Sequence, residues 1–252
     1  FSTDGKLVLT ASSDDLTYLW ETDTGKVVRR LDAFAWAAAL SPDAALVLTG
    51  EEKAVRLWDA ATGKEVRKFI GHTKRVRSVG FSPDGKLALT GSWDGTARLW
   101  ETATGKELRQ FKGTPFCVFP VTFSPDGAFV LGASGNTTCL WETATGKEVR
   151  KFEGHLQLVW SVAYSIDGRF ALTASADKTA RLWEVATGKE IRKFEAQKEE
   201  VRSAAFSPDG RYVVTASNDG RTHIWAVAES NVSGLAEPAK SLYGHTKDVW
   251  NV

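Results

Sequence analysis

Short stretches in which apolar and polar residues alternate run through the whole chain, separated by turns rich in Gly, Pro and Asp. Such alternation is typical of a half-buried strand, and Pro-Asp-Gly or Asp-Gly steps are typical of tight turns. In one round of this pattern the turns are Pro83-Asp84-Gly85 and Asp94-Gly95, and the expected strands cover 75–81, 86–92, 96–101 and 107–111. The four strands of a round are named a, b, c and d in chain order.

Two landmarks recur at a spacing of about 40 residues, which indicates a repeat architecture. A Trp near the end of strand c recurs as Trp20, Trp58, Trp100, Trp141, Trp183 and Trp225. The residue that closes strand a recurs as Phe1, Leu40, Phe81, Phe123, Tyr164 and Phe206. Both landmarks keep their register over six rounds, so each round is expected to be one structural unit.

Strand d of each round alternates apolar residues with Arg and Lys, as in the stretch Glu-Val-Arg-Lys-Phe at 65–69. Charged residues along an outer strand oppose pairing with the edges of other chains. We therefore expect strand d to be the outermost strand of each sheet, and strand a, the most apolar, to be the innermost.

These residues resemble the WD-repeat β-propeller family, in a highly repetitive form of bacterial type, and the resemblance covers the whole chain. It implies an all-β fold, a β-propeller of six four-stranded antiparallel blades. The stretch Val249–Val252 matches 76–79 of a strand a, so we expect it to complete the first blade and close the ring. The alternative is a segment of a seven-bladed or longer array.

Length and composition limit the number of domains, the classes of partner and the cellular compartment that we expect. A length of 252 residues fits a single domain over 1–252, and a net charge of +1 without a basic cluster argues against nucleic acid or a membrane as partner. Cys117 and Cys139 form no disulfide framework, which favours a reducing, cytoplasmic compartment. The chain starts in mid-round at Phe1, so we expect it to be cut from a longer protein whose other domains are partners.

The resemblance gives most histidines a structural role. In the resembling family, a His before strand a, an Asp of the b–c turn, a Ser or Thr of strand b and the strand-c Trp form a buried hydrogen-bonded tetrad. The matching residues are His72, Asp94 and Trp100 with Thr90 or Ser92, then His155, Asp177 and Trp183 with Thr173 or Ser175, and, through ring closure, His245, Asp14 and Trp20 with Thr10 or Ser12. A buried indole N–H needs such an acceptor.

A Ser–His–Asp hydrolase site or a metal site is the alternative for these residues. An active site normally occurs once, whereas this trio recurs, and neither the His nor the Cys residues have paired ligand spacing. His223 takes the strand-c position of Arg98 and Arg181, so we expect it at the surface. We expect no catalytic residue, no metal and no cofactor.

Four of the ten Trp residues lie outside the strand-c motif: Trp36, Trp93, Trp160 and Trp250. When each strand a is aligned on its last residue, the position four residues earlier holds Trp36, Arg77, Phe119, Trp160, Arg202 and Trp250. In the resembling family this position, and that of Trp93 in the b–c turn, lie near the mouth of the central channel. The aromatic residues could simply fill the channel, but Trp and Arg are enriched at binding hot spots, which favours a partner-binding surface.

The sequence therefore favours a non-enzymatic protein-interaction or sensor module that binds a protein or peptide on the face with the d–a and b–c loops. Its near-identical Ala-Thr-Gly-Lys-Glu steps are similar to those of bacterial signalling or defence proteins, where a propeller serves the attached domains. The alternative is a propeller enzyme or small-ligand binder that uses the central channel. That alternative needs a single, non-repeated cluster of carboxylates or metal ligands, which the sequence does not display.

Overall fold

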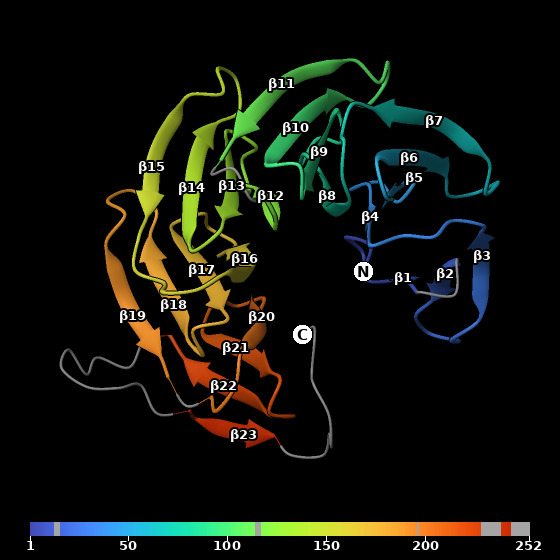
Figure 1. Ribbon diagram of the computed structural model, residues 1–252. Coiled ribbons are helices and arrows are strands. Elements are labelled where there is room, and N and C mark those ends of the chain that lie inside the picture. Colours follow the sequence, from blue (N-terminus) through green and yellow to red (C-terminus); the bar gives the residue numbers. More distant parts are fainter. Residues whose placement is uncertain (13–15, 114–116, 196, 228–237, 243–252) are drawn as a thin grey trace. The chain divides into compact units, whose positions relative to one another are not determined.

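The computed structural model describes residues 1–12, 16–113, 117–195, 197–227 and 238–242, and all regular secondary structure among them is β-strand (Figure 1). The first two sheets contain β1 (Leu7–Ala11), β2 (Thr17–Glu21) and β3 (Val27–Leu31), and β4 (Ala37–Leu40), β5 (Leu46–Gly50), β6 (Ala54–Asp59) and β7 (Glu65–Ile70). The third contains β8 (Val76–Phe81), β9 (Leu87–Ser92), β10 (Thr96–Glu101) and β11 (Glu107–Lys112). None of these residues forms a helix long and apolar enough to cross a bilayer.

The other three sheets repeat the same order. They contain β12 (Val121–Phe123), β13 (Phe129–Ser134), β14 (Thr137–Glu142) and β15 (Glu148–Phe152); β16 (Val159–Tyr164), β17 (Phe170–Ser175), β18 (Ala180–Glu184) and β19 (Glu190–Phe194); and β20 (Val201–Phe206), β21 (Tyr212–Ser217), β22 (Thr222–Ala226) and β23 (Lys240–Leu242). Neighbouring strands follow one another in sequence in every sheet.

The predicted fold class is confirmed: the chain is all-β and consists of six antiparallel sheets with the strand order of propeller blades. Five sheets have four strands, and the first has three among the described residues. The segment Val249–Val252, which the sequence assigns to the fourth place, lies outside the described residues. Closure of a ring therefore stays a prediction.

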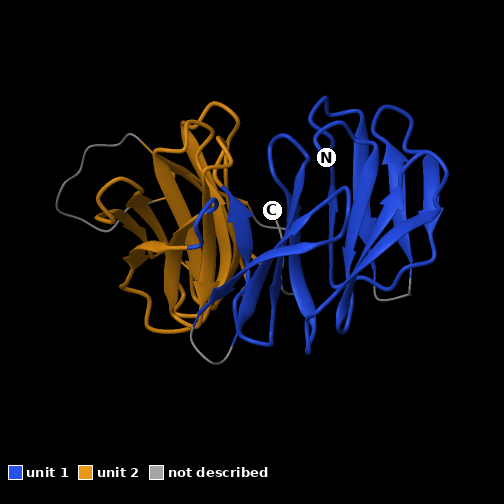
Figure 2. Ribbon diagram, turned by 90° about the horizontal axis from the view of Figure 1, so that it is seen from above, with its two compact units in different colours: residues 1–123, 143–146 blue, residues 124–142, 147–252 orange. Residues whose placement is uncertain are grey.

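The chain divides into two compact units, which Figure 2 shows in different colours. Unit 1 consists of residues 1–123 and 143–146, and unit 2 of residues 124–142 and 147–252. Each unit is described by itself below. Unit 1 holds the sheets β1 to β3, β4 to β7 and β8 to β11, and unit 2 holds the sheets β16 to β19 and β20 to β23.

The a–b turns are fixed by their Ser and Asp residues. In unit 1 the Ser82 hydroxyl donates to Asp84 at 2.7 Å, Asp84 accepts the backbone N–H of Lys86, and Ser82 Oγ accepts the N–H of Leu87. Gly85 follows with a φ of 71°, a left-handed conformation that Gly adopts without steric cost. In the second round Ala44 holds the same place with a φ of 58°.

The core of each unit lies between consecutive sheets and is centred on the strand-c Trp. In unit 1, Trp100 packs with Phe69 of the preceding strand d at a ring-centroid distance of 5.7 Å. Unit 2 repeats this contact between Phe152 and Trp183, at 5.8 Å. The buried Phe of strand d therefore packs against the next sheet as well as belonging to its own.

The Arg residues of strand d also reach the next sheet. Arg67 donates to the carbonyl oxygen of Thr102 at 2.9 Å, and Arg192 makes the equivalent bond to Ala226. The expectation that the Arg and Lys residues of strand d only protect an edge is thus incomplete, because the Arg residues join consecutive sheets while Lys68 and Lys151 are exposed.

Candidate functional site

Backbone hydrogen bonds hold the loops that carry the surplus aromatic residues of unit 1. The N–H of Trp36 donates to Gly50 at the end of β5, and the N–H of Trp93 donates to the carbonyl oxygen of Arg75. The N–H of Val76, the first residue of β8, donates to Glu51 in the b–c turn of the preceding sheet. These bonds fix the backbone just before β4, at Trp36, and just before β8, at Arg75. The strands β4 and β8 lie side by side (Figure 1).

The side chains of Trp36, Arg75, Arg77, Trp93 and Phe119 form one group in unit 1, named the Trp36 cluster. The Cζ atoms of Arg75 and Arg77 lie 4.5 and 5.0 Å from the ring centroid of Trp36. Arg75 also lies 5.7 Å from the centroid of Trp93, which is 40% exposed and stacks on Phe119. The cluster therefore combines cations with aromatic faces.

Two polar groups of the Trp36 cluster differ in their bonding. Arg75 Nε lies 2.8 Å from Glu52 Oε1, and both side chains are partly exposed, at 40% and 58%. The Nε1 atom of Trp36 is buried and has no hydrogen-bond partner among the described residues. A buried donor without an acceptor costs about 1–3 kcal/mol.

Unit 2 holds the equivalent Trp160 cluster, defined as Trp160, Glu200, Arg202 and Asn218. The Cζ atom of Arg202 lies 4.4 Å from the ring centroid of Trp160. Glu200 Oε2 accepts the Trp160 Nε1–H at 3.2 Å and lies 2.9 Å from Arg202 Nη2. Arg202 Nε donates to Asn218 at 3.1 Å. A single carboxylate thus serves both the indole and the guanidinium.

The structure therefore brings most of the predicted binding residues together within their own units. Unit 1 holds Trp36, Arg77, Trp93 and Phe119, unit 2 holds Trp160 and Arg202, and Trp250 lies outside the described residues. The sequence predicts Phe119 as a partner-binding residue; its side chain is only 9% exposed and stacks with Trp93.

Arg75 and Glu200 escaped the sequence analysis, although the signal was present. Each lies two residues before the aligned position, at Arg77 and Arg202. The strand register shifts at Arg77 and Arg202, yet Arg75 reaches Trp36 and Glu200 reaches Trp160, the same side chains that the aligned Arg residues contact.

The tetrad residues are joined by short hydrogen bonds in both units. In unit 1 the Trp100 Nε1–H donates to Thr90 Oγ1 at 2.9 Å, Thr90 Oγ1 lies 2.7 Å from His72 Nε2, and His72 Nδ1 lies 2.7 Å from Asp94. Unit 2 repeats this arrangement with Trp183, Thr173, His155 and Asp177. Thr90 and Thr173, rather than Ser92 and Ser175, contact the Trp. Trp20 bonds Thr10, while Asp14 and His245 lie outside the described residues.

Burial sets the charges of the tetrad. It lowers the pKa of His72, although the contact with Asp94 acts in the opposite direction. Burial would raise the pKa of Asp94, but hydrogen bonds from Thr96 and His72 outweigh it and lower that pKa. A neutral His72 with its proton on Nδ1 then donates to an ionised Asp94 and accepts from Thr90.

This trio has the residue types of a hydrolase triad but cannot act as one. The Thr90 hydroxyl is fully buried, and its oxygen already accepts the indole N–H of Trp100. A nucleophile must be able to reach a substrate carbonyl, and this oxygen is closed off on all sides. Within the described ranges, no group of three or more His, Cys, Asp and Glu side chains could hold a metal ion.

The last described sheet of unit 2 departs from the pattern. Gln197 takes the place of the tetrad His, and its Nε2 donates to Thr215, which also accepts the Trp225 Nε1–H. The expectation of a surface position for His223 is wrong: it is 3% exposed because β23 covers it, and its Nδ1 bonds the Ser241 hydroxyl at 2.7 Å. Burial lowers the pKa of His223.

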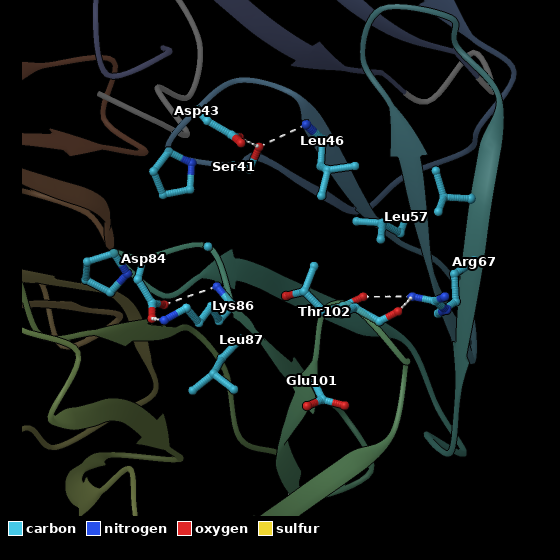
Figure 3. Close-up of a pocket in the computed structure, with 15 residues that line it drawn as sticks. Ser41, Asp43, Leu46, Leu57, Arg67, Asp84, Lys86, Leu87, Glu101 and Thr102 are labelled. Atoms are coloured by element: carbon cyan, nitrogen blue, oxygen red, sulfur yellow. Dashed lines mark hydrogen bonds and ion pairs between the residues drawn. The ribbon is translucent and has the colours of Figure 1, made fainter.

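A groove of about 670 Å³ opens between the second and third sheets of unit 1, near the a–b turns and the c–d loop (Figure 3). Leu46, Leu57, Val66 and Leu87 line it. Asp84 accepts the N–H of Lys86 and the Arg67 head bonds the carbonyl oxygens of the c–d loop, while the buried Thr102 Oγ1 has no hydrogen-bond partner among the described residues.

Unit 2 contains a groove of about 420 Å³ whose lining residues stand 83 positions after those of unit 1, as Leu140 does after Leu57. A groove that recurs at equivalent positions of the repeat is a seam between consecutive sheets. The Trp36 cluster, by contrast, differs from its counterpart in unit 2, and this difference marks it as the better candidate site.

The strand order, the Trp core and the tetrads define a repeat protein of the β-propeller class. Residues 63–101, 146–184 and 188–226 match the family described as WD domain, G-beta repeat, so the chain contains WD40 repeats. These three segments are the rounds with a complete set of landmarks, apart from Gln197.

Among similar proteins are Protein HIR1 of Yarrowia lipolytica, 27% identical over 118 residues, and eukaryotic translation initiation factor 3 subunit I of Aspergillus terreus, 33% identical over 93 residues. These matches cover 38% and 35% of this chain but only 11% and 27% of the relatives. Probable cytosolic iron-sulfur protein assembly protein Ciao1 of Culex quinquefasciatus is 39% identical over 66 residues, 24% of this chain and 20% of the relative. These relatives are eukaryotic and give no support to the bacterial type expected from the sequence.

Proposed function

We propose that the chain is a non-enzymatic protein-interaction module that binds a partner protein or peptide through its two Trp–Arg clusters. The observation that carries this proposal is the stacking of Arg on a partly exposed Trp in both units, at 4.5 to 5.0 Å for Trp36 and at 4.4 Å for Trp160. Trp and Arg are the side chains most enriched at binding hot spots, because they combine a large apolar area with directed hydrogen-bond donors.

Three further features support a binding surface. Trp93 is 40% exposed although it is a large aromatic residue, and it adjoins Arg75. In unit 2, Leu156 and Leu158 of the d–a loop lie just before β16, which contains Trp160, and are 82% and 42% exposed. The WD40 segments agree with a role of this kind, and the named relatives include an initiation-factor subunit and an assembly protein. We also propose that the module belongs to a longer protein and binds either another domain of that protein or a separate partner.

A library of random peptides displayed on phage tests the proposal even though the natural partner is not identified. We expect peptides selected on the wild-type chain to lose at least about tenfold in affinity for Trp36→Ala or Trp160→Ala, as hot-spot losses of about 2 kcal/mol or more require. Both variants should keep most of their stability, since both side chains are partly exposed.

Val66→Ala, in the seam groove of unit 1, is the matched control and should leave the affinity unchanged. Selected peptides that bind both Trp variants as tightly as wild type would contradict the proposal. So would a selection that yields no peptide.

A further inference from the structure

The loop between β15 and β16 of unit 2 carries two exposed leucines where the equivalent loops carry polar or charged residues. Leu156 and Leu158 lie between the buried residues His155 and Val159 and are 82% and 42% exposed. The equivalent positions before β8 are Thr73 and Arg75, and those before β20 are Lys198 and Glu200. A single exposed Leu is ordinary on a protein surface, but two within three residues, just before the partly exposed Trp160, make this surface mainly apolar. Residues 156–158 are named the Leu156 loop.

Hydrogen bonds fix the backbone at both ends of the Leu156 loop. The N–H of Leu156 donates to Asp177 Oδ2 at 3.0 Å, and the carbonyl oxygen of Leu158 accepts the N–H of Ala176 at 2.8 Å. Both partners lie in the turn between β17 and β18, and Asp177 is itself held by His155 of the tetrad. A partner that covers the two Leu side chains therefore does not have to order the loop, which removes one cost of binding.

Two ion pairs lie next to the Leu156 loop. Lys178, in the same turn between β17 and β18, has its Nζ atom 2.8 Å from the carbonyl oxygen of Lys198 and 3.8 Å from Glu199 Oε2. On the side of Trp160, Glu200 lies 2.9 Å from Arg202. Because each cation faces a carboxylate, neither pair leaves a net charge for a charged side chain of a partner to meet. An uncharged, apolar segment therefore suits this surface best.

We propose that the Leu156 loop binds an uncharged, aliphatic segment of a partner protein, in which a Leu, Ile or Val side chain packs against Leu156 and Leu158. The removal of apolar surface from water drives such a contact, and the ion pairs beside it form a polar rim around the apolar centre. Trp160, two residues after Leu158, continues this surface toward the Trp160 cluster. This inference rests on the proposed function and names its partner class.

A lipid surface is the other apolar partner that a loop with exposed leucines could meet. Segments that lie on membranes combine apolar residues with a surplus of Lys and Arg, which attracts anionic lipids. Beside the Leu156 loop, Lys178 and Arg202 already face Glu199 and Glu200. These ion pairs favour a protein segment over a membrane.

A library of random peptides displayed on phage, depleted first on a double variant, isolates the binders that need this loop. The double variant combines Leu156→Lys with Leu158→Glu, which are the residues of the equivalent loop before β20, and it keeps the net charge of the chain. Peptides that pass this step are then selected on the wild-type chain. We expect them to share an uncharged consensus with at least one Leu, Ile or Val, whose replacement by Ser weakens binding at least about tenfold.

Single variants and melting experiments separate binding from folding. Leu156→Met keeps an apolar side chain and should bind the selected peptides like the wild type. Leu156→Thr, with the residue of the equivalent loop before β8, should lose about tenfold in affinity. Every variant should melt close to the wild-type temperature, because the replaced side chains are exposed and the loop is held by its backbone.

A selection that yields no peptide after depletion, or a consensus that requires Asp, Glu, Lys or Arg, would overturn the proposal. So would two results that assign the loop elsewhere: binding to vesicles of phosphatidylcholine and phosphatidylserine that the double variant loses, or a dimer in analytical ultracentrifugation that the double variant loses. If selection without depletion yields peptides that depend on Trp36 or Trp160 and none that depends on the Leu156 loop, the interaction function stands and the aliphatic partner is wrong.

Discussion

Units 1 and 2 share one core construction, and their Trp–Arg clusters differ. In both, the strand-c Trp packs against a Phe of the preceding strand d and donates to a Thr of strand b. In both, an Arg of one strand a stacks on the Trp that lies at or just before the start of the preceding strand a. The exchange of Glu200 for Arg75 separates them. The comparison shows that the repeated core positions support the fold, whereas the charge at an equivalent surface position differs between the units.

The largest expected effect tests whether the two cores are equivalent. Trp100→Ala in unit 1 and Trp183→Ala in unit 2 each remove a nearly inaccessible side chain and leave a cavity, which should lower the free energy of unfolding by about 3–5 kcal/mol. Urea unfolding followed by circular dichroism measures both. Trp160→Ala, at a partly exposed Trp, is the control and should cost clearly less. If Trp160→Ala is as damaging as Trp183→Ala, the Trp160 cluster is packing.

A smaller effect should distinguish the two clusters directly. Glu200→Gln keeps an acceptor for Trp160 but removes the charge that faces Arg202, and we expect a loss of about 1 kcal/mol in stability. Glu52→Gln in unit 1 should change stability by no more than about 0.5 kcal/mol, because the Arg75–Glu52 pair is more exposed than the Arg202–Glu200 pair. Equal losses in thermal melts would remove the difference between the clusters.

The pH dependence of stability can compare the tetrad position of His72 in unit 1 with that of Gln197 in unit 2. Burial lowers the pKa of His72, so the unfolded chain takes up a proton first as pH falls below about 6.5. Its contribution to stability is therefore complete above about pH 6.5 and declines on acidification, and the lowered pKa of Asp94 adds a further loss at lower pH. Gln197 already fills this place in unit 2, so His72→Gln should flatten the decline between about pH 6.5 and 5.

Urea midpoints across this pH range measure the effect. Gln197→His should do the reverse and steepen the decline. A slope that neither variant alters would show that these positions do not set the acid sensitivity of the chain.

The smallest effect concerns one turn of each unit. Ala44 has a φ of 58° where other rounds have Gly, and a left-handed conformation costs a residue with a Cβ about 1–2 kcal/mol. Because Gly adds chain entropy in the unfolded state, Ala44→Gly should gain only about 0.5 kcal/mol. Gly210→Ala in unit 2, where a Cβ meets no atom within 4 Å, should lose a similar amount in the same melting experiment. A loss of stability in Ala44→Gly would contradict this account.

Much of the fold followed from residues that are close in sequence. The Ser-Pro-Asp-Gly turns, the alternation of strand residues and the regular Trp spacing predicted the strands and their order, because turn geometry and strand pairing depend on neighbours along the chain. The sequence did not decide which strand-b hydroxyl accepts the N–H of the strand-c Trp, since both Thr90 and Ser92 could accept a hydrogen bond. Only the packing of strand c on strand b placed Thr90 beneath Trp100.

The sequence by itself determined that this protein is a six-round all-β repeat with surplus aromatic residues, and its family resemblance implied the tetrads of His72 and His155. The tertiary structure decided what lies beside those aromatic residues: Arg75 and Arg77 on Trp36, Glu200 and Arg202 on Trp160, Phe119 beneath Trp93, and β23 over His223. The first set depends on the local periodicity of one chain segment. The second joins side chains from different strands or from consecutive sheets, and their contacts are set by packing and charge that no single segment contains.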